Sequence, residues 1–268
     1  MALLKNIKHL IIDMDGVLYR GNEPMPRLGE FIAFLRGRPV PFLLVTNNST
    51  RTPQERSAQM ARMGVQIAPS EILVSGQAVA RYLRREYPVG TRVHVFGMPA
   101  LRTAMEEEGF VLADDDVNVV VASVDTEVTY AKIRRAVDLI RGGARFIATN
   151  LDPNIPSEGG RLPGSGSMIA MLAVASEIQP TSVGKPEPTM YELAMAQMGA
   201  SPGTTAAVGD RAETDILGGK RAGLTTICVL SGASGRAEAE AAGSDYIFND
   251  IGHLLDVWQA ALTSHTTV

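Results

Sequence analysis

Two carboxylates follow an apolar run near the start of the chain. The run His9–Ile12 is typical of a buried strand, and Asp13, Met14, Asp15 and Gly16 come directly after it. On a regular strand Asp13 and Asp15 would share one face, where two like charges about 4 Å apart repel by roughly 4 kcal/mol at an effective dielectric constant of about 20. A divalent cation would offset this repulsion, and oxygen ligands favour Mg²⁺. The alternative is a polar turn, because Asp and Gly are common turn residues.

A hydroxyl and two amides follow a second apolar run. Thr46, Asn47 and Asn48 come directly after Val40–Val45. In such a turn the hydroxyl and the following backbone N–H groups can hold a phosphate oxygen. Asn and Ser are also ordinary turn and helix-cap residues, so the stretch has a purely structural interpretation as well.

A lysine is held between a glycine and a proline, as Gly184-Lys185-Pro186. Its ammonium is a fixed point charge, suited to a phosphoryl oxygen or to a buried carboxylate. The alternative is a solvated loop lysine, which is the usual environment of this residue type.

A second pair of acids follows the apolar run Thr205–Val208. Gly209 and Asp210 come directly after it, and Asp215 lies five residues beyond Asp210. Asp215 could instead be an acid at a helix N-terminus, favoured by the helix dipole. Because ligands of parallel α/β sheets collect outside the carboxyl ends of the strands, we expect these four polar groups to form one site.

The elements that must position these residues alternate along the chain. Apolar runs predict strands at His9–Ile12, Val40–Val45, Arg92–Phe96, Val117–Val124, Arg145–Ala148, Thr205–Val208, Thr225–Leu230 and Tyr246–Phe248. Several of them are continuously apolar, as is typical of strands covered on both faces. Helical patterns predict helices at Leu28–Leu35, Pro53–Met63, Gln77–Glu86, Leu101–Glu108, Tyr130–Ile140, Ser167–Ser176, Thr189–Met198, Asp215–Ala222 and Ile251–Leu262. Alternation of this kind predicts an α/β fold with a doubly wound parallel sheet.

Two local signals add detail to this outline. Thr52 and Glu55 flank Pro53 as a helix N-cap and the acid of a capping box. Proline and glycine are dense in Pro153–Gly166, which predicts a long loop, and loops of that length are often functional.

Composition limits the class of protein. A chain of 268 residues suits one large or two modest domains. The net charge of −4 implies no general affinity for nucleic acid, and no apolar run approaches the ~20 residues that cross a membrane. Residues 1–5 are too short an apolar start for a signal peptide. The single cysteine, Cys228, fits a reducing, cytoplasmic setting.

Taken together, the polar groups resemble the four motifs of the haloacid dehalogenase-like phosphohydrolases. Those motifs look like Asp13-Met14-Asp15-Gly16, Thr46-Asn47, Lys185, and Gly209-Asp210 with Asp215. The resemblance is strongest to the NagD-like and nitrophenylphosphatase branch, through Asp-Gly-Val-Leu-Tyr-Arg-Gly at 15–21, Thr-Asn-Asn at 46–48, Ala-Thr-Asn-Leu-Asp-Pro at 148–153 and Gly-Lys-Pro-Glu-Pro at 184–188.

The resemblance implies a role for each motif residue. Asp13 would be the nucleophile that forms an aspartyl phosphate, and Asp15 the general acid and base. Asp13 and Asp210 would bind Mg²⁺ through their carboxylates. A main-chain oxygen of Met14 or Asp15 would be a further ligand, and Asp215 would bind the ion directly or through water. Five further residues complete the implied phosphate and substrate contacts: Thr46, Lys185, Asn47 and, beside them, Gly16 and Asn48.

The same resemblance implies a Rossmann-like core of 1–78 and 183–268 with an inserted α/β cap of 79–182. Within the cap, Asn150, Asp152 and the loop to Gly166 are candidate substrate-facing residues, whose polarity suits a small polar leaving group such as a sugar, nucleoside or phospho-acid. We expect hydrolysis of small phosphomonoesters, with no nucleic-acid or membrane partner, and the family allows a homodimer. Phosphotransfer to another acceptor and non-catalytic phosphate binding are the alternatives.

Overall fold

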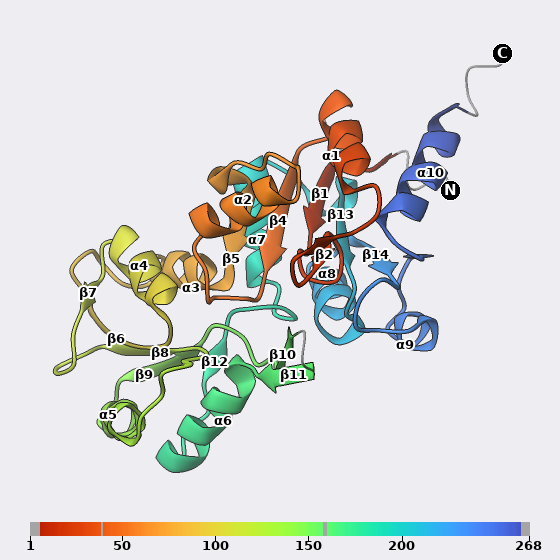
Figure 1. Ribbon diagram of the computed structural model, residues 1–268. Coiled ribbons are helices and arrows are strands. Elements are labelled where there is room, and N and C mark those ends of the chain that lie inside the picture. Colours follow the sequence, from red (N-terminus) through yellow and green to blue (C-terminus); the bar gives the residue numbers. More distant parts are fainter. Residues whose placement is uncertain (1–5, 39, 158–159, 264–268) are drawn as a thin grey trace. The chain divides into compact units, whose positions relative to one another are not determined.

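The computed structural model describes residues 6–38, 40–157 and 160–263 (Figure 1). Residues 1–5, on which the expectation about a leader depends, lie outside the described part. The chain forms two compact units. The core unit comprises the chain up to Thr46, Arg56–Leu73 and the chain from Lys185 onward, and the insert unit comprises Asn47–Glu55 and Val74–Gly184. The sequence-based boundaries of 1–78, 79–182 and 183–268 stay a prediction.

The core unit is built on a six-stranded sheet. Its order is β15-β14-β13-β1-β4-β5, formed by β1 (His9–Ile12), β4 (Phe42–Thr46), β5 (Ile72–Val74), β13 (Thr205–Gly209), β14 (Thr225–Val229) and β15 (Tyr246–Phe248). β1 pairs in parallel with β4 and β13, and so do β13 with β14 and β14 with β15. Every residue of β4 and β13 is buried, which explains their continuous apolar sequence.

The order of the strands defines a switch point in this sheet. From β1 the chain moves outward to β4 and β5, and it later returns to the other side of β1 to lay down β13, β14 and β15. Ligands of open α/β sheets bind outside the carboxyl ends of the strands at such a point. A ligand site is therefore expected at the edge of the sheet where β1 and β13 end.

Helices and short turns complete the core unit. They are α1 (Leu28–Gly37), α2 (Pro53–Arg62), α7 (Thr189–Met198), α8 (Leu217–Arg221), α9 (Arg236–Ala241), α10 (Ile251–Thr263) and the 3₁₀ turns Pro69–Glu71 and Pro202–Thr204. A π turn, Ala212–Ile216, precedes α8. A small hairpin of β2 (Tyr19–Arg20) and β3 (Glu23–Pro24) follows β1. α1 packs against α10 and buries an apolar stripe with helical spacing, Leu28, Phe31, Ile32 and Leu35.

The start of α2 confirms its predicted capping box. The backbone N–H of Thr52 donates to Glu55 Oε2 at 2.7 Å, and the N–H of Glu55 donates to Thr52 Oγ1 at 3.2 Å. Two N–H groups that the first helical turn leaves without intrahelical partners are thereby satisfied.

The insert unit carries its own parallel sheet. The order is β12-β9-β8-β6-β7, from β6 (Arg92–Phe96), β7 (Val111–Leu112), β8 (Val119–Ala122), β9 (Arg145–Ala148) and β12 (Thr181–Ser182). Its helices are α3 (Ser75–Arg84), α4 (Pro99–Glu107), α5 (Tyr130–Arg141) and α6 (Ser165–Ser176). Residues of β8, β9, α5 and α6 share one apolar cluster.

The predicted α/β class with doubly wound parallel strands is confirmed, and the structure differs from the prediction in a few segments. The predicted loop Pro153–Gly166 contains an antiparallel hairpin, β10 (Asn154–Ser157) with β11 (Gly160–Pro163), and its positions 158–159 lie outside the described residues. The predicted helix Asp215–Ala222 begins earlier, as the π turn. In the described part of the chain, no helix combines the length and the apolar character needed to cross a bilayer.

Candidate active site

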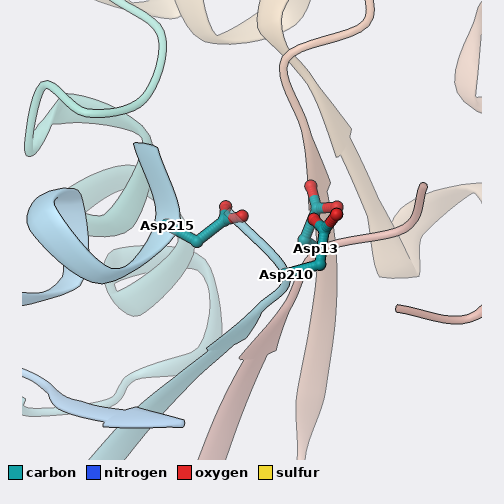
Figure 2. A group of neighbouring side chains, drawn as sticks. All are labelled: Asp13, Asp210 and Asp215. Carbon is teal, nitrogen blue, oxygen red and sulfur yellow. The ribbon is translucent and has the colours of Figure 1, made fainter. Parts of the chain in front are cut away.

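The register of the central strands places Asp13 beside Asp210. Ile12 on β1 pairs with Val208 on β13, and the N–H of Asp13 continues the ladder by donating to the Val208 carbonyl at 2.8 Å. Each aspartate therefore leaves the sheet at the end of its own strand, at the switch point. Figure 2 shows the two carboxylates next to each other.

Asp215 joins them from the π turn that follows β13. Its Oδ2 accepts the backbone N–H of Arg211 at 3.1 Å, and Figure 2 shows its carboxylate pointing toward the other two. Asp13, Asp210 and Asp215 are all buried, and one carboxylate oxygen of each lies within 4.8 Å of the others. We call these three residues the carboxylate cluster.

Lys185 is the cation of this cluster. Its Nζ donates to Asp13 Oδ1 at 2.5 Å, to Asp215 Oδ1 at 2.6 Å and to the carbonyl of Val45 at 3.3 Å. The side chain is only 4 % exposed. Lys185 is thus the buried partner of carboxylates, one of the two environments that its position between glycine and proline predicted.

The carboxylate cluster holds more negative than positive charge. Three carboxylates face one ammonium, so two negative charges have no counter-charge within the group. Burial raises the pKa of the Asp13 carboxyl well above its usual range. The positive charge of Lys185 lowers this pKa, whereas the negative charges of Asp215 and Asp210 raise it further. Burial also raises the pKa of Asp210 to about 6, and Asp215 contributes. Burial alone would lower the pKa of Lys185, but Asp13 and Asp215 raise it well above its usual range.

These observations fit a divalent cation. Buried ions without a partner are costly, and a hard divalent ion takes carboxylate oxygens as ligands. Two uncompensated charges on three convergent carboxylates match one such ion in both charge and donor type. The shifted pKa values of the carboxylate cluster also indicate a functional site, because strongly shifted pKa values are common among the residues of such sites.

Asp15 is not a member of the carboxylate cluster. Its carboxylate accepts the hydroxyl of Tyr19 at 3.3 Å and lies 4.0 Å from Nη2 of Arg56. The side chain of Asp15 is 39 % exposed, whereas that of Asp13 is buried. The two carboxylates therefore have different environments, as a nucleophile and a separate acid and base require. Metal binding through a main-chain oxygen at this position stays a prediction.

Gly16 must be a glycine for two reasons. Its φ of +84° is in the left-handed region, which other residues rarely adopt. A Cβ built on it would also collide with the carboxylate of Asp210. The predicted polar turn after β1 is real, and it brings the backbone into contact with the carboxylate cluster.

The sequence analysis missed the segment Ser231–Gly235. The N–H of Ala233 donates to Asp210 Oδ2 at 2.7 Å, and Ser231 Oγ donates to the carbonyl of Gly16 at 2.7 Å. A Cβ on Gly232 would overlap the Asp210 carboxylate. The signal available was the run Ser-Gly-Ala-Ser-Gly directly after a predicted strand. Tyr191 was missed as well; its hydroxyl donates to the carbonyl of Asp215 at 3.1 Å.

Four of the predicted residues belong to the insert unit. Asn47 Nδ2 donates to Asp152 Oδ2 at 3.0 Å, and Asn150 Nδ2 donates to the carbonyl of Asn47 at 2.8 Å. Asn48 Oδ1 accepts the N–H of Thr50 at 3.0 Å and its hydroxyl at 2.7 Å. The structure brings Asn47, Asn150 and Asp152 together, while Asn48 stabilises a local turn. Contact of these side chains with a substrate stays a prediction. Thr46, in the core unit, is buried at the end of β4.

Comparisons with known proteins agree with this geometry. The model of the haloacid dehalogenase-like hydrolases matches residues 10–111, and a HAD-hydrolase-like model matches residues 182–254. The acid sugar phosphatase of Staphylococcus saprophyticus is 36 % identical over 255 residues, covering 94 % of this chain and 98 % of that protein.

Solved structures extend the comparison. The 4-nitrophenylphosphatase of Thermotoga maritima superposes with a TM-score of 0.90 at 31 % identity, covering 95 % of this chain and 98 % of that one. The glycerol phosphate phosphatase of Mycobacterium tuberculosis, solved in complex with magnesium, gives 0.88 at 31 % identity, covering 94 % and 77 %. The prediction of an enzyme of the phosphatase class is confirmed. The chain belongs to the haloacid dehalogenase-like hydrolase family, in the branch that contains the nitrophenylphosphatases.

Proposed function

We propose that the protein is a Mg²⁺-dependent phosphomonoester hydrolase that works through an aspartyl phosphate on Asp13. The observation that carries the proposal is the carboxylate cluster around Lys185, with its two uncompensated negative charges at the switch point of the sheet. The magnesium-bound relative supports the choice of ion.

Asp13, Asp210 and Asp215 would hold the ion, together with a main-chain oxygen at Met14 or Asp15. When bound, Mg²⁺ supplies positive charge that offsets the repulsion between the Asp13 carboxylate and a phosphate dianion. Lys185 and Thr46, with the backbone N–H of Asn47, are proposed to hold phosphoryl oxygens. Preorganised positive charge and donors of this kind are usually the largest contribution to catalysis.

In the first half-reaction, a carboxylate oxygen of Asp13 bonds to phosphorus. The ester bond between phosphorus and the leaving oxygen breaks, and Asp15 gives that oxygen its proton. The product alcohol leaves, and Asp15 remains as a carboxylate.

In the second half-reaction, that carboxylate takes a proton from water. The water oxygen bonds to phosphorus, the bond from phosphorus to Asp13 breaks, and inorganic phosphate is released. Asp13 regains its charge and Asp15 its proton, so the cycle closes.

The substrates that we propose are small phosphorylated metabolites. Candidates are sugar phosphates, glycerol phosphate, nucleotides, phosphoglycolate and, as a test compound, nitrophenyl phosphate. The names of the relatives support the first two and the last. We propose Gly16, Asn47, Asn48, Asn150 and Asp152 as substrate-binding residues, because the polar side chains among them suit a polar leaving group.

We also propose a cytoplasmic setting. Cys228 is the only cysteine of the chain and is buried, and burial raises the pKa of its thiol to about 12. Such a thiol is inert and forms no structural disulfide. The homodimer that the family allows stays a prediction.

Phosphate release from nitrophenyl phosphate and a panel of metabolites, with and without Mg²⁺, tests the proposal. We expect activity that a chelator removes and added Mg²⁺ restores. Asp13→Asn should abolish turnover with an unchanged circular dichroism spectrum, and acid quenching of wild type should trap a phosphoenzyme that hydroxylamine cleaves. Glu213→Gln, an exposed acid in the same turn as Asp215, is the matched control and should keep full activity. Near-normal kcat in Asp13→Asn would refute the assignment.

A further inference from the structure

A buried arginine faces the carboxylate that we assign as acid and base. Arg56 lies on α2, and its side chain is 3 % exposed. Its Nη1 donates to the hydroxyl of Tyr19 and to Oε1 of Gln59, both at 3.0 Å. Its Nη2 lies 4.0 Å from Oδ2 of Asp15. In the described part of the chain, Nε and Nη2 are buried without a hydrogen-bond partner.

The charge of Arg56 identifies its functional partner. Both groups that accept its hydrogen bonds, a phenol and an amide, are neutral. A guanidinium removed from water without a negative partner is costly, and Asp15 is the carboxylate that the structure pairs with Arg56. The pair therefore restricts where the Asp15 carboxylate lies.

One hydrogen-bond donor and one positive charge face the same oxygen of Asp15. Tyr19 accepts a hydrogen bond from Arg56 and donates its own proton to Asp15 Oδ2 at 3.3 Å, and Nη2 of Arg56 approaches that oxygen too. Arginine has no acceptor, and the single hydroxyl proton of Tyr19 is already used. In this arrangement Oδ1 is the oxygen of Asp15 that is left to carry a proton.

We propose that Arg56 and Tyr19 are positioning residues, which hold Oδ2 of Asp15 so that Oδ1 is the atom that exchanges protons in both half-reactions. This inference rests on the proposed function, because it concerns the same acid and base. In the first step the proton passes from Oδ1 to the leaving oxygen as the bond from that oxygen to phosphorus breaks. In the second step Oδ1 takes a proton from the attacking water. Arg56 and Tyr19 keep their own protons throughout.

Two aryl esters of similar size separate this role from a merely structural one. Nitrophenolate is a weak base and leaves without a proton, whereas the more basic phenolate of phenyl phosphate needs general-acid help. A misplaced Asp15 should therefore slow the first step only with phenyl phosphate. It should slow the second step equally with both esters, because the phosphoenzyme is the same.

We expect Arg56→Gln to lower kcat for phenyl phosphate about 10- to 100-fold, with KM changed by less than about twofold, as for a misplaced catalytic group. Tyr19→Phe should act in the same direction by a smaller factor. With nitrophenyl phosphate, rapid-quench measurements should show a burst of about one nitrophenolate per site, because the first step keeps its rate while the second is slowed.

The matched control is Arg62→Gln, which removes an exposed arginine from the same helix. It should behave as wild type with both esters. Equal losses on the two esters without a burst, or variants of Arg56 and Tyr19 that match the control, would overturn the inference. If Arg56→Gln fails to fold in a thermal melt, Tyr19→Phe decides, since it removes a single hydroxyl.

The same measurements separate this inference from the proposed function. A wild-type protein that releases no phosphate from either ester in Mg²⁺ refutes the proposed function. An active wild type whose Arg56 and Tyr19 variants behave like Arg62→Gln refutes the positioning role alone.

Discussion

At the scale of single residues, the site depends on one lysine shared by two carboxylates. Lys185 pairs with both Asp13 and Asp215 through short hydrogen bonds, while Asp210 accepts the N–H of Ala233. Without a metal, Asp210 is therefore the member of the carboxylate cluster with no direct ion pair in the described residues. Burial is the main cause that raises its pKa to about 6, and the charge of Asp215 adds to it.

The raised pKa of Asp210 predicts how stability varies with pH when metal is absent. Between the unfolded value of about 4 and about 6, the folded protein holds a proton that the unfolded chain has released. The free energy of unfolding should therefore fall as pH rises through this range, by up to about 3 kcal/mol from this group. Asp210→Asn should reduce the fall.

Urea denaturation in a chelator, at steps from pH 4 to pH 7, measures this effect. Asp13 also has a raised pKa, so the slope should shrink in Asp210→Asn without vanishing. Glu213→Gln should retain the wild-type slope. If Asp210→Asn had the same dependence of unfolding free energy on pH as wild type, ionisation of Asp210 would not affect stability, and the prediction would be wrong.

The site residues that could be placed from the sequence alone are those that directly follow a buried strand. Asp13 and Asp210 directly follow buried strands, so the sequence was enough to place them at one edge. The sequence could not show that Asp15 faces Arg56 and Tyr19, because the positive φ of Gly16 redirects the chain there. Arg56 lies 37 residues from Tyr19, and no local pattern links the two.

At the scale of elements, the segment Ser231–Gly235 after β14 approaches the carboxylate cluster through its backbone. Gly232 lies so close to Asp210 that a Cβ would overlap the carboxylate. The neighbouring N–H of Ala233 can then reach Oδ2. Small residues have no hydrophobic period, so the run Ser-Gly-Ala-Ser-Gly after a predicted strand was the signal that the sequence offered for this segment.

Gly232→Ala should weaken the site and the fold together. The added methyl group must displace the Asp210 carboxylate or the segment, and such overpacking costs about 1–3 kcal/mol. We expect a lower thermal midpoint and weaker Mg²⁺ binding by calorimetry. Gly29→Ala is the control, because nothing lies near its Cβ and it is in α1, where alanine stabilises by roughly 0.5–1 kcal/mol. A Gly232→Ala protein with unchanged Mg²⁺ affinity would contradict this account.

Strand prediction succeeded for the longer buried runs and missed several short strands, among them β5 (Ile72–Val74), which is fully buried but only three residues long. The runs that became β1, β13 and β14 consist mainly of apolar residues, and their sequence alone identifies them. The two-residue strands β2, β3, β7 and β12 are too short for any periodicity. The hairpin β10–β11 carries proline and glycine, which predicted a loop.

At the scale of the whole molecule, the carboxylate cluster belongs entirely to the core unit. A ligand that binds only the folded state stabilises it by mass action, by about 2.7 kcal/mol at 100 times its Kd. Mg²⁺ should therefore raise the unfolding free energy of the core unit in a concentration-dependent way.

Hydrogen exchange with and without Mg²⁺ tests this directly. We expect added protection in the peptides that contain the ends of β1 and β13, where Asp13 and Asp210 lie. Peptides from the middle of β8 and α5, in the insert unit, should exchange at the same rate in both conditions. Asp13→Asn should lose the Mg²⁺ effect. Protection confined to the insert unit would argue that the ion binds elsewhere.

The parts of this centre lie far apart along the chain, since Lys185 and Asp13 are 172 residues from each other. During synthesis, Asp13 therefore leaves the ribosome long before Lys185, Asp210 and Asp215 exist. A nascent or prematurely terminated polypeptide that ends before Asp215 lacks part of the carboxylate cluster. The activity that we propose can therefore arise only once translation has passed Asp215.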